Sequence, residues 1–166
     1  FNVLIGGGQK YFDSRDDERD LLTEFSNKGY KVIETEKYAN NPQFFNRVST
    51  SDVDNIIAFI DEGKPSKASK RGEVLPISSK FAIEKLDNMS DDKGFFLRSE
   101  SSQIDWACHI NSKSWLSEEL LDFEKTIAHV LDFAEKDGET LVVITADHET
   151  GGLALEDGSV VDKEVN

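Results

Sequence analysis

Five short runs rich in β-branched and aromatic residues alternate with helical patterns along most of the chain. Runs of this length and composition are typical of β-strands. Strands that alternate with helices favour a parallel sheet with helices on both faces, because each crossover places a helix against the sheet. We therefore predict an α/β fold of this kind, with strands at 2–8, 30–35, 55–61, 94–100 and 140–147.

Helix signals lie between most of these runs. The segment 17–29 carries acids in its first turn and ends at a glycine, and the segment 76–88 begins with a proline, which favours the first turn of a helix. The clearest helix is expected after Ser117 and should end at Gly138. Its apolar face, at spacings of three and four, comprises Phe123, Ile127, Val130, Leu131 and Ala134.

Length and charge narrow the class of protein. The 166 residues fit one domain, 1–166, which we expect to be incomplete because the chain begins at Phe1 with a strand-like run. A net charge of -14 argues against nucleic-acid and anionic membrane partners, and indicates a solvated surface rather than a substrate-steering one. No apolar stretch approaches the ~20 residues that span a bilayer. A single cysteine, Cys108, excludes an internal disulfide.

Polar side chains of metal-binding type follow two of the predicted strands. Glu100 ends one run, and Asp147 with His148 ends another before two glycines. Ligands gather beyond the carboxyl ends of parallel strands, so these residues should face one site. Asp105 and His109 are four residues apart, so a helix places both on one face. A carboxylate with a neutral imidazole is part of a typical zinc ligand set.

Each of these features also has a structural explanation. An Asp/His pair four residues apart is most often a surface pair, and a carboxylate after a strand is most often a helix cap. The coincidence of two such pairs and a glutamate favours a metal site. His129 is expected to be solvated. The glycines at 6–8 and the acids at 13–20 lack the spacing of a phosphate loop or an EF-hand, and no activated serine stands out.

Three blocks carry a resemblance to a known family. The segment "GFFLRSESSQIDWACH" resembles the alkaline phosphatase block GFFLMVEGSQIDWAGH, and "DGETLVVITADHETGG" is similar to that family's TADHETGG block. The start, "NVLIGGGQKYF", is similar to the family's strand followed by GGG and KYF. The resemblance runs in order from Phe1 to Gly152 and implies an incomplete alkaline-phosphatase-like fold.

The resemblance also implies roles for individual residues. Asp105 and His109 would ligate a first Zn²⁺, Asp147 and His148 a second, and Glu100 an Mg²⁺, with Trp106 beside the phosphate pocket. In this family two zinc ions about 4 Å apart hold the phosphoryl group of a phosphate monoester while a serine attacks it. The serine, the aspartate beside it, the phosphate-binding arginine, a second Mg²⁺ ligand and the last histidine of the first zinc site match no position in this chain. We therefore predict no catalytic residue here, no hydrolysis by the chain alone, and only weak metal binding by it.

The family also implies a secreted or periplasmic enzyme, with a homodimer possible for the full-length protein. Two departures stand beside the metal blocks. Cys108 replaces a glycine, either as a zinc ligand or, as we favour, as a small packed side chain. Arg98 could pair with Glu100 and compete with the cation. The alternative function is a non-catalytic module that binds divalent metal or a protein partner.

Two other segments are expected to lie at the surface. The polar segment 61–74 is predicted to be a loop, and the tail is predicted to form a hairpin that turns at Asp157 and Gly158.

Overall fold

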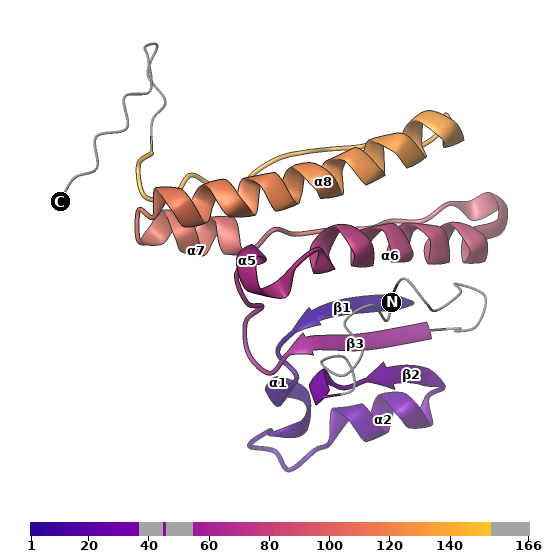
Figure 1. Ribbon diagram of the computed structural model, residues 1–166. Helices are drawn as coiled ribbons and strands as arrows, with labels where there is room; N and C mark the ends of the chain where they lie inside the picture. Colours follow the sequence, from indigo (N-terminus) through magenta and orange to yellow (C-terminus); the bar gives the residue numbers. More distant parts are fainter. Residues whose placement is uncertain (37–44, 46–54, 154–166) are drawn as a thin grey trace, which may run out of the picture.

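A small parallel sheet forms one half of the molecule (Figure 1). The computed structural model describes residues 1–36, 45 and 55–153. The strands are β1 (Val3–Gly7), β2 (Tyr30–Ile33) and β3 (Asn55–Asp61), in the order β1-β3-β2. Both neighbours run parallel to β3, and the register pairs Ile5 and Ile33 with Ala58. The α/β fold and the first three predicted strands are confirmed.

The central strand β3 supplies the core. Ile56, Ile57, Ala58 and Phe59 have no exposed surface, because β3 has a strand on each side and helices above and below. A strand buried on both faces reads as a continuous apolar run, and this is the pattern of its sequence. The ring of Phe12 packs edge-on against Phe59, with 4.9 Å between the ring centroids.

Helices cover both faces of the sheet (Figure 1). On one side lie α1 (Lys10–Asp13) and α2 (Leu21–Asn27), and on the other lies α6 (Val74–Ser90), followed by the 3₁₀ turn η2 (Asp91–Lys93). The carboxylate of Asp20 accepts hydrogen bonds from the backbone N–H groups of Leu22 and Thr23, which fixes the start of α2. In α6, Pro76 is the third residue, so the helix begins two residues before the predicted start.

A second layer of helices lies beyond α6, away from the sheet (Figure 1). It contains α7 (Gln103–His109) and α8 (Lys113–Asp137), whereas the short helix α5 (Ala68–Arg71) lies level with α6 in Figure 1. The segment 61–74, predicted to be a loop, thus contains one short helix. Gly138 adopts φ 76° and closes α8, as predicted, whereas the helix begins before Ser117. None of the helices in the described ranges is both long and apolar enough to cross a membrane.

The buried face of α8 differs from the predicted one. Trp115, Glu119, Asp122 and Thr126 are its buried residues, whereas Leu131 of the predicted apolar face is exposed and the rest of that face is at most partly buried. The reason is Arg71 at the end of α5, whose guanidinium lies 2.8 Å from Glu119 and 2.6 Å from Asp122. A charge pair across helices far apart in sequence leaves no trace in local periodicity.

Two of the predicted strands are wrong in the described structure. Residues 94–100 and 140–147 belong to no sheet. A strand needs a neighbour for its backbone N–H and C=O groups, and within the described residues neither segment has one. Alternate side chains are accordingly open to solvent, with Phe96 89% and Leu141 86% exposed, whereas Phe95, Leu97 and Val142 are partly buried. The predicted hairpin at Asp157 and Gly158 lies outside the described residues.

Candidate metal-binding site

The first Asp/His pair lies on α7, as predicted. Asp105 Oδ2 and His109 Nε2 are 3.3 Å apart, because residues four apart on a helix share a face. Both side chains are exposed at 40% or more. Ser102 precedes the helix but its hydroxyl caps no backbone N–H. The helix therefore presents a carboxylate and an imidazole together to solvent.

The second pair lies where the extended segment 140–146 ends. Asp147 Oδ2 and His148 Nε2 are 3.6 Å apart. Consecutive side chains on a strand point to opposite faces, so this proximity requires a backbone that has already left the extended form. The structure places Asp147 and His148 in a bend before Gly151 and Gly152.

Thr150 joins the two pairs. Its hydroxyl donates to Asp105 Oδ1 at 2.9 Å and lies 3.0 Å from His148 Nδ1. Since the hydroxyl proton goes to Asp105, the contact with His148 requires Nδ1 to carry a proton. The carbonyl oxygen of Glu149, 2.8 Å from the same nitrogen, can only accept and leads to the same tautomer. Nε2 of His148 then keeps its lone pair, as a metal-binding imidazole must.

Charge around His148 favours its protonated form in the absence of a cation. The hydrogen bond to the Glu149 carbonyl raises the pKa of His148 above 6.5, and the carboxylates of Asp147, Asp105 and Glu149 add to this. Three carboxylates close to one imidazole form a region of negative potential, which attracts cations.

Gly151 brings the second pair against α7. A Cβ atom at position 151 would lie 2.2 Å from the carbonyl oxygen of Cys108, so only glycine fits this contact. Its φ of +79° also belongs to the left-handed region that glycine adopts without strain. The Cys108 side chain itself is a half-buried free thiol.

Glu100 is not joined to the other four predicted ligands. Its carboxylate lies 3.3 Å from the guanidinium of Arg98, the pair predicted from the sequence, and no hydrogen bond or ion pair links it to either Asp/His pair. It lines a small pocket between β1, α6 and the start of α7. Within the described residues, Ser101 Oγ and Gln103 Nε2 are buried there without a hydrogen-bond partner.

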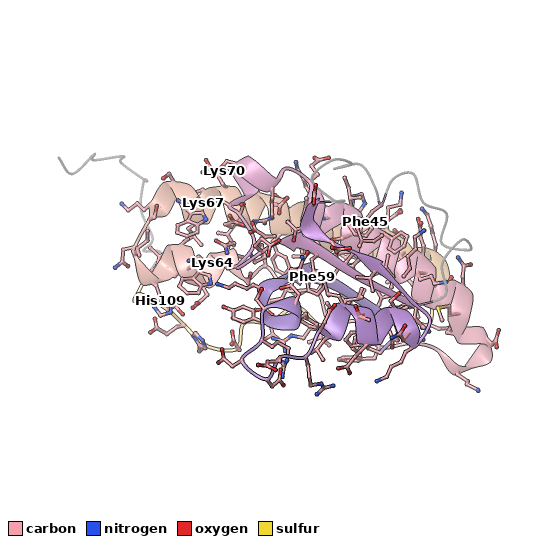
Figure 2. The ribbon with its side chains drawn as sticks, turned by 90° about the horizontal axis from the view of Figure 1, so that it is seen from below. Phe45, Phe59, Lys64, Lys67, Lys70 and His109 are labelled. Carbon is pink, nitrogen blue, oxygen red and sulfur yellow. The ribbon has the colours of Figure 1, made fainter. Side chains whose placement is uncertain are left out.

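Trp106 borders the first pair and carries a cation over its ring. Its ring centroid lies 6.4 Å from that of His109, and the ammonium of Lys64 lies 3.7 Å from the Trp106 centroid. Figure 2 shows Lys64 and His109 on the same side of the molecule. Sequence reasoning singled out neither Lys64 nor Thr150. Thr150 stands two residues after His148, which is the only signal that could have drawn attention to it.

The donor atoms suit zinc, although the described residues do not form a closed metal centre. Carboxylate oxygens and neutral imidazole nitrogens are common zinc ligands, and the Thr150 bridge places two sets of them side by side. In the described part of the chain, no group of three or more His, Cys, Asp or Glu side chains is close enough to hold an ion. Each pair therefore offers two ligands. His129, as predicted, is exposed and lies elsewhere, on α8.

Comparisons with known proteins agree on one family. The family model described as alkaline phosphatase matches residues 1–165. Alkaline phosphatase 3 of Bacillus subtilis is 38% identical over 93% of this chain, and the repressible alkaline phosphatase of Saccharomyces cerevisiae is 32% identical over 92%. The chain spans 31% and 30% of the lengths of these two relatives.

Solved structures show the same likeness. The alkaline phosphatase of the Antarctic bacterium TAB5 superimposes with a TM-score of 0.78 and 35% identity, over 92% of this chain and 42% of that one. A variant of the TAB5 enzyme, described as having Mg bound in its M3 site, gives a TM-score of 0.73 at 33% identity, over the same 92% and 42%.

Proposed function

Because the chain belongs to the alkaline phosphatase family, we propose that it supplies two zinc-binding Asp/His pairs to an enzyme that hydrolyses phosphate monoesters. The observation that supports this most directly is the Thr150 bridge, which brings Asp105 and His148 together from segments 43 residues apart in the sequence. Asp105 and His109 would hold one ion, and Asp147 and His148 the other. Zinc, when bound, would supply Lewis-acid activation of oxygen at the phosphoryl group.

The chain's own residues prepare these ligands. The Glu149 carbonyl keeps the proton of His148 on Nδ1, and Thr150 orients both that ring and the Asp105 carboxylate. Such outer contacts fix the orientation and the tautomer of a ligand before the ion arrives. Glu100 would contribute to an Mg²⁺ site, where Arg98 offsets part of its charge.

The remaining parts of the reaction are proposed to come from outside this chain. A serine nucleophile, a phosphate-binding arginine and further metal ligands have no counterpart in its sequence. The isolated chain should therefore hydrolyse nothing, and 1–166 would act as one part of a larger catalytic domain. We also propose that the complete protein is secreted or periplasmic and able to form a homodimer.

Zinc titration tests the ligand assignment. Isothermal calorimetry of the chain should show Zn²⁺ binding that His148→Ala and His109→Ala each weaken about 10-fold or more. His129→Ala is the matched control, because it removes an exposed imidazole from α8 and should leave the affinity unchanged. Equal affinity in all four proteins would rule out both pairs as ligands.

A phosphatase assay separates the enzyme from the non-catalytic alternative. With p-nitrophenyl phosphate and Zn²⁺, the full-length protein should turn over and the chain 1–166 should not exceed the metal-only blank. Zinc binding without turnover by the full-length protein would favour the metal-binding module instead.

A further inference from the structure

The loop after β3 places a cation beside the first Asp/His pair. The ammonium of Lys64 and the ring of His109 both border Trp106, so they are no more than about 10 Å apart. This distance is close to the Debye length at 0.1 M salt, so the charge of Lys64 acts on a charged ligand bound at the rim, the exposed surface around Asp105 and His109.

The backbone that carries Lys64 is held firmly. Gly7 at the end of β1 lies against the carbonyl oxygen of Gly63 and the ring of Pro65, and a Cβ atom there would be 2.3 Å from that oxygen. The Lys10 N–H donates to the Glu62 carbonyl at 3.2 Å. Lys64 therefore projects from a fixed turn, so that its backbone needs no further ordering when the side chain binds a ligand.

A second lysine of the same loop provides the contrast. Lys67 lies 3.8 Å over the ring of Trp115, but Trp115 is only 9% exposed and its Nε1–H donates to Glu119. That pair is part of the packing between α5 and α8. Trp106 is 44% exposed, so the pair with Lys64 faces solvent at the rim.

The charge of Lys64 is not neutralised within the protein. Among the described residues no carboxylate forms an ion pair with it, unlike Arg71, which Glu119 and Asp122 hold. An indole face attracts an ammonium without occupying its N–H donors, so these stay available to an anion. A net charge of -14 repels anions, and a fixed cation at the rim offsets this locally.

We propose that Lys64, held over Trp106, is a substrate-binding residue that contacts the anionic phosphoryl group of the ester and of the phosphate product. The assignment rests on the proposed function, since it needs phosphate to bind beside the Asp/His pairs. Because the same contact forms with substrate and product, it acts on affinity and leaves the chemical step unchanged.

Steady-state kinetics of the metal-loaded full-length protein provide the first test. At low salt, Lys64→Met should raise both the KM for p-nitrophenyl phosphate and the Ki for inorganic phosphate about 3- to 10-fold, with kcat within about 2-fold. The difference between Lys64→Met and wild type should shrink at 0.5 M NaCl. Lys64→Arg should keep most of the wild-type affinity, because it keeps the positive charge. Lys70→Met, which removes an exposed cation from the neighbouring helix α5, should behave as wild type. An unchanged KM and Ki in Lys64→Met would overturn the proposal.

A binding measurement keeps this test separate from the proposed activity. Inorganic phosphate added to the metal-loaded full-length protein should change the indole fluorescence. Trp106→Phe should abolish this change, and Lys64→Met should shift its midpoint about 3- to 10-fold higher. If the wild type binds phosphate without hydrolysing esters, the proposed enzymatic function is wrong, but the phosphate-binding role of Lys64 is still supported. Equal midpoints in wild type and Lys64→Met would refute the role of Lys64, whatever the activity.

Discussion

Two parts of the molecule have similar sequence patterns but different structures: the sheet half, with strands β1 to β3, and the rim half, with α7 and the segments 94–100 and 140–152. The run at 55–61 lies between two strands and its apolar side chains are mostly buried. The run at 140–147 is even richer in β-branched residues, yet no strand of the described structure pairs with it. An apolar run shows that a segment can be a strand, whereas a neighbouring strand decides whether it is one.

The largest expected effect on stability comes from a phenylalanine of the sheet half, and a phenylalanine of the rim half is its control. Phe59→Ala should lower the free energy of unfolding by ~3–5 kcal/mol, because it removes a fully buried ring from β3. Phe96→Ala should change it by less than ~0.5 kcal/mol, since Phe96 is 89% exposed. Urea unfolding followed by circular dichroism measures both. A large cost for Phe96→Ala would show that this segment is packed in solution and would remove the contrast.

Weakening the polar contact that joins α5 to α8 should have the second-largest effect on the free energy of unfolding. Glu119 accepts hydrogen bonds from the Ala68 N–H, Arg71 and Trp115, so Glu119→Gln should cost about 2 kcal/mol. Asp122→Asn should cost less at pH 7, because burial already raises the pKa of the Asp122 carboxyl above 3.8. The same urea experiment applies.

The raised pKa of Asp122 also has a pH signature. The folded protein holds this proton more tightly than the unfolded chain does. The contribution of the Asp122 carboxyl to the free energy of unfolding is therefore fully present below pH 3.8, and it is lost as the pH rises through the folded pKa. Asp122→Asn should flatten the stability profile in that window. An unchanged slope in the variant would assign the effect to another group.

Removing the Thr150 hydroxyl should affect the rim half without affecting the sheet. Thr150→Val keeps the shape of the side chain and should weaken Zn²⁺ binding about 10-fold, because Asp105 and His148 lose their shared partner. Thr150→Ser should retain the affinity. If valine and serine behave alike in calorimetric titration, the hydroxyl does not orient the ligands.

The smallest effect concerns the starts of two helices. Asp20→Ala should lower the melting temperature by about 3 °C, because Asp20 caps two backbone N–H groups of α2. Ser102→Ala should leave it unchanged, since the Ser102 hydroxyl caps none in α7. Differential scanning fluorimetry suffices for this pair. Equal shifts would show that Ser102 caps α7 in solution.

Local sequence predicted what depends on local structure. The spacing of Asp105 and His109 gave their common helix face, and the glycines gave the ends of α2 and α8. The buried stripe of α8 was mispredicted, because Arg71 determines it from 48 residues before Glu119. Thr150 and Lys64 depend on contacts with α7 that no periodicity encodes. Their importance follows only from three-dimensional structure, whereas the roles of the five predicted ligands stay predictions.

The glycine at position 151 carries a consequence for how this region can change. Its contact with Cys108 is between two main chains, so the separation of the two Asp/His pairs does not depend on a movable side chain. Substitutions of exposed neighbours would alter charge and leave that separation intact. A single added methyl group at position 151 would instead force the two segments apart, and the two proposed ions would no longer be held side by side.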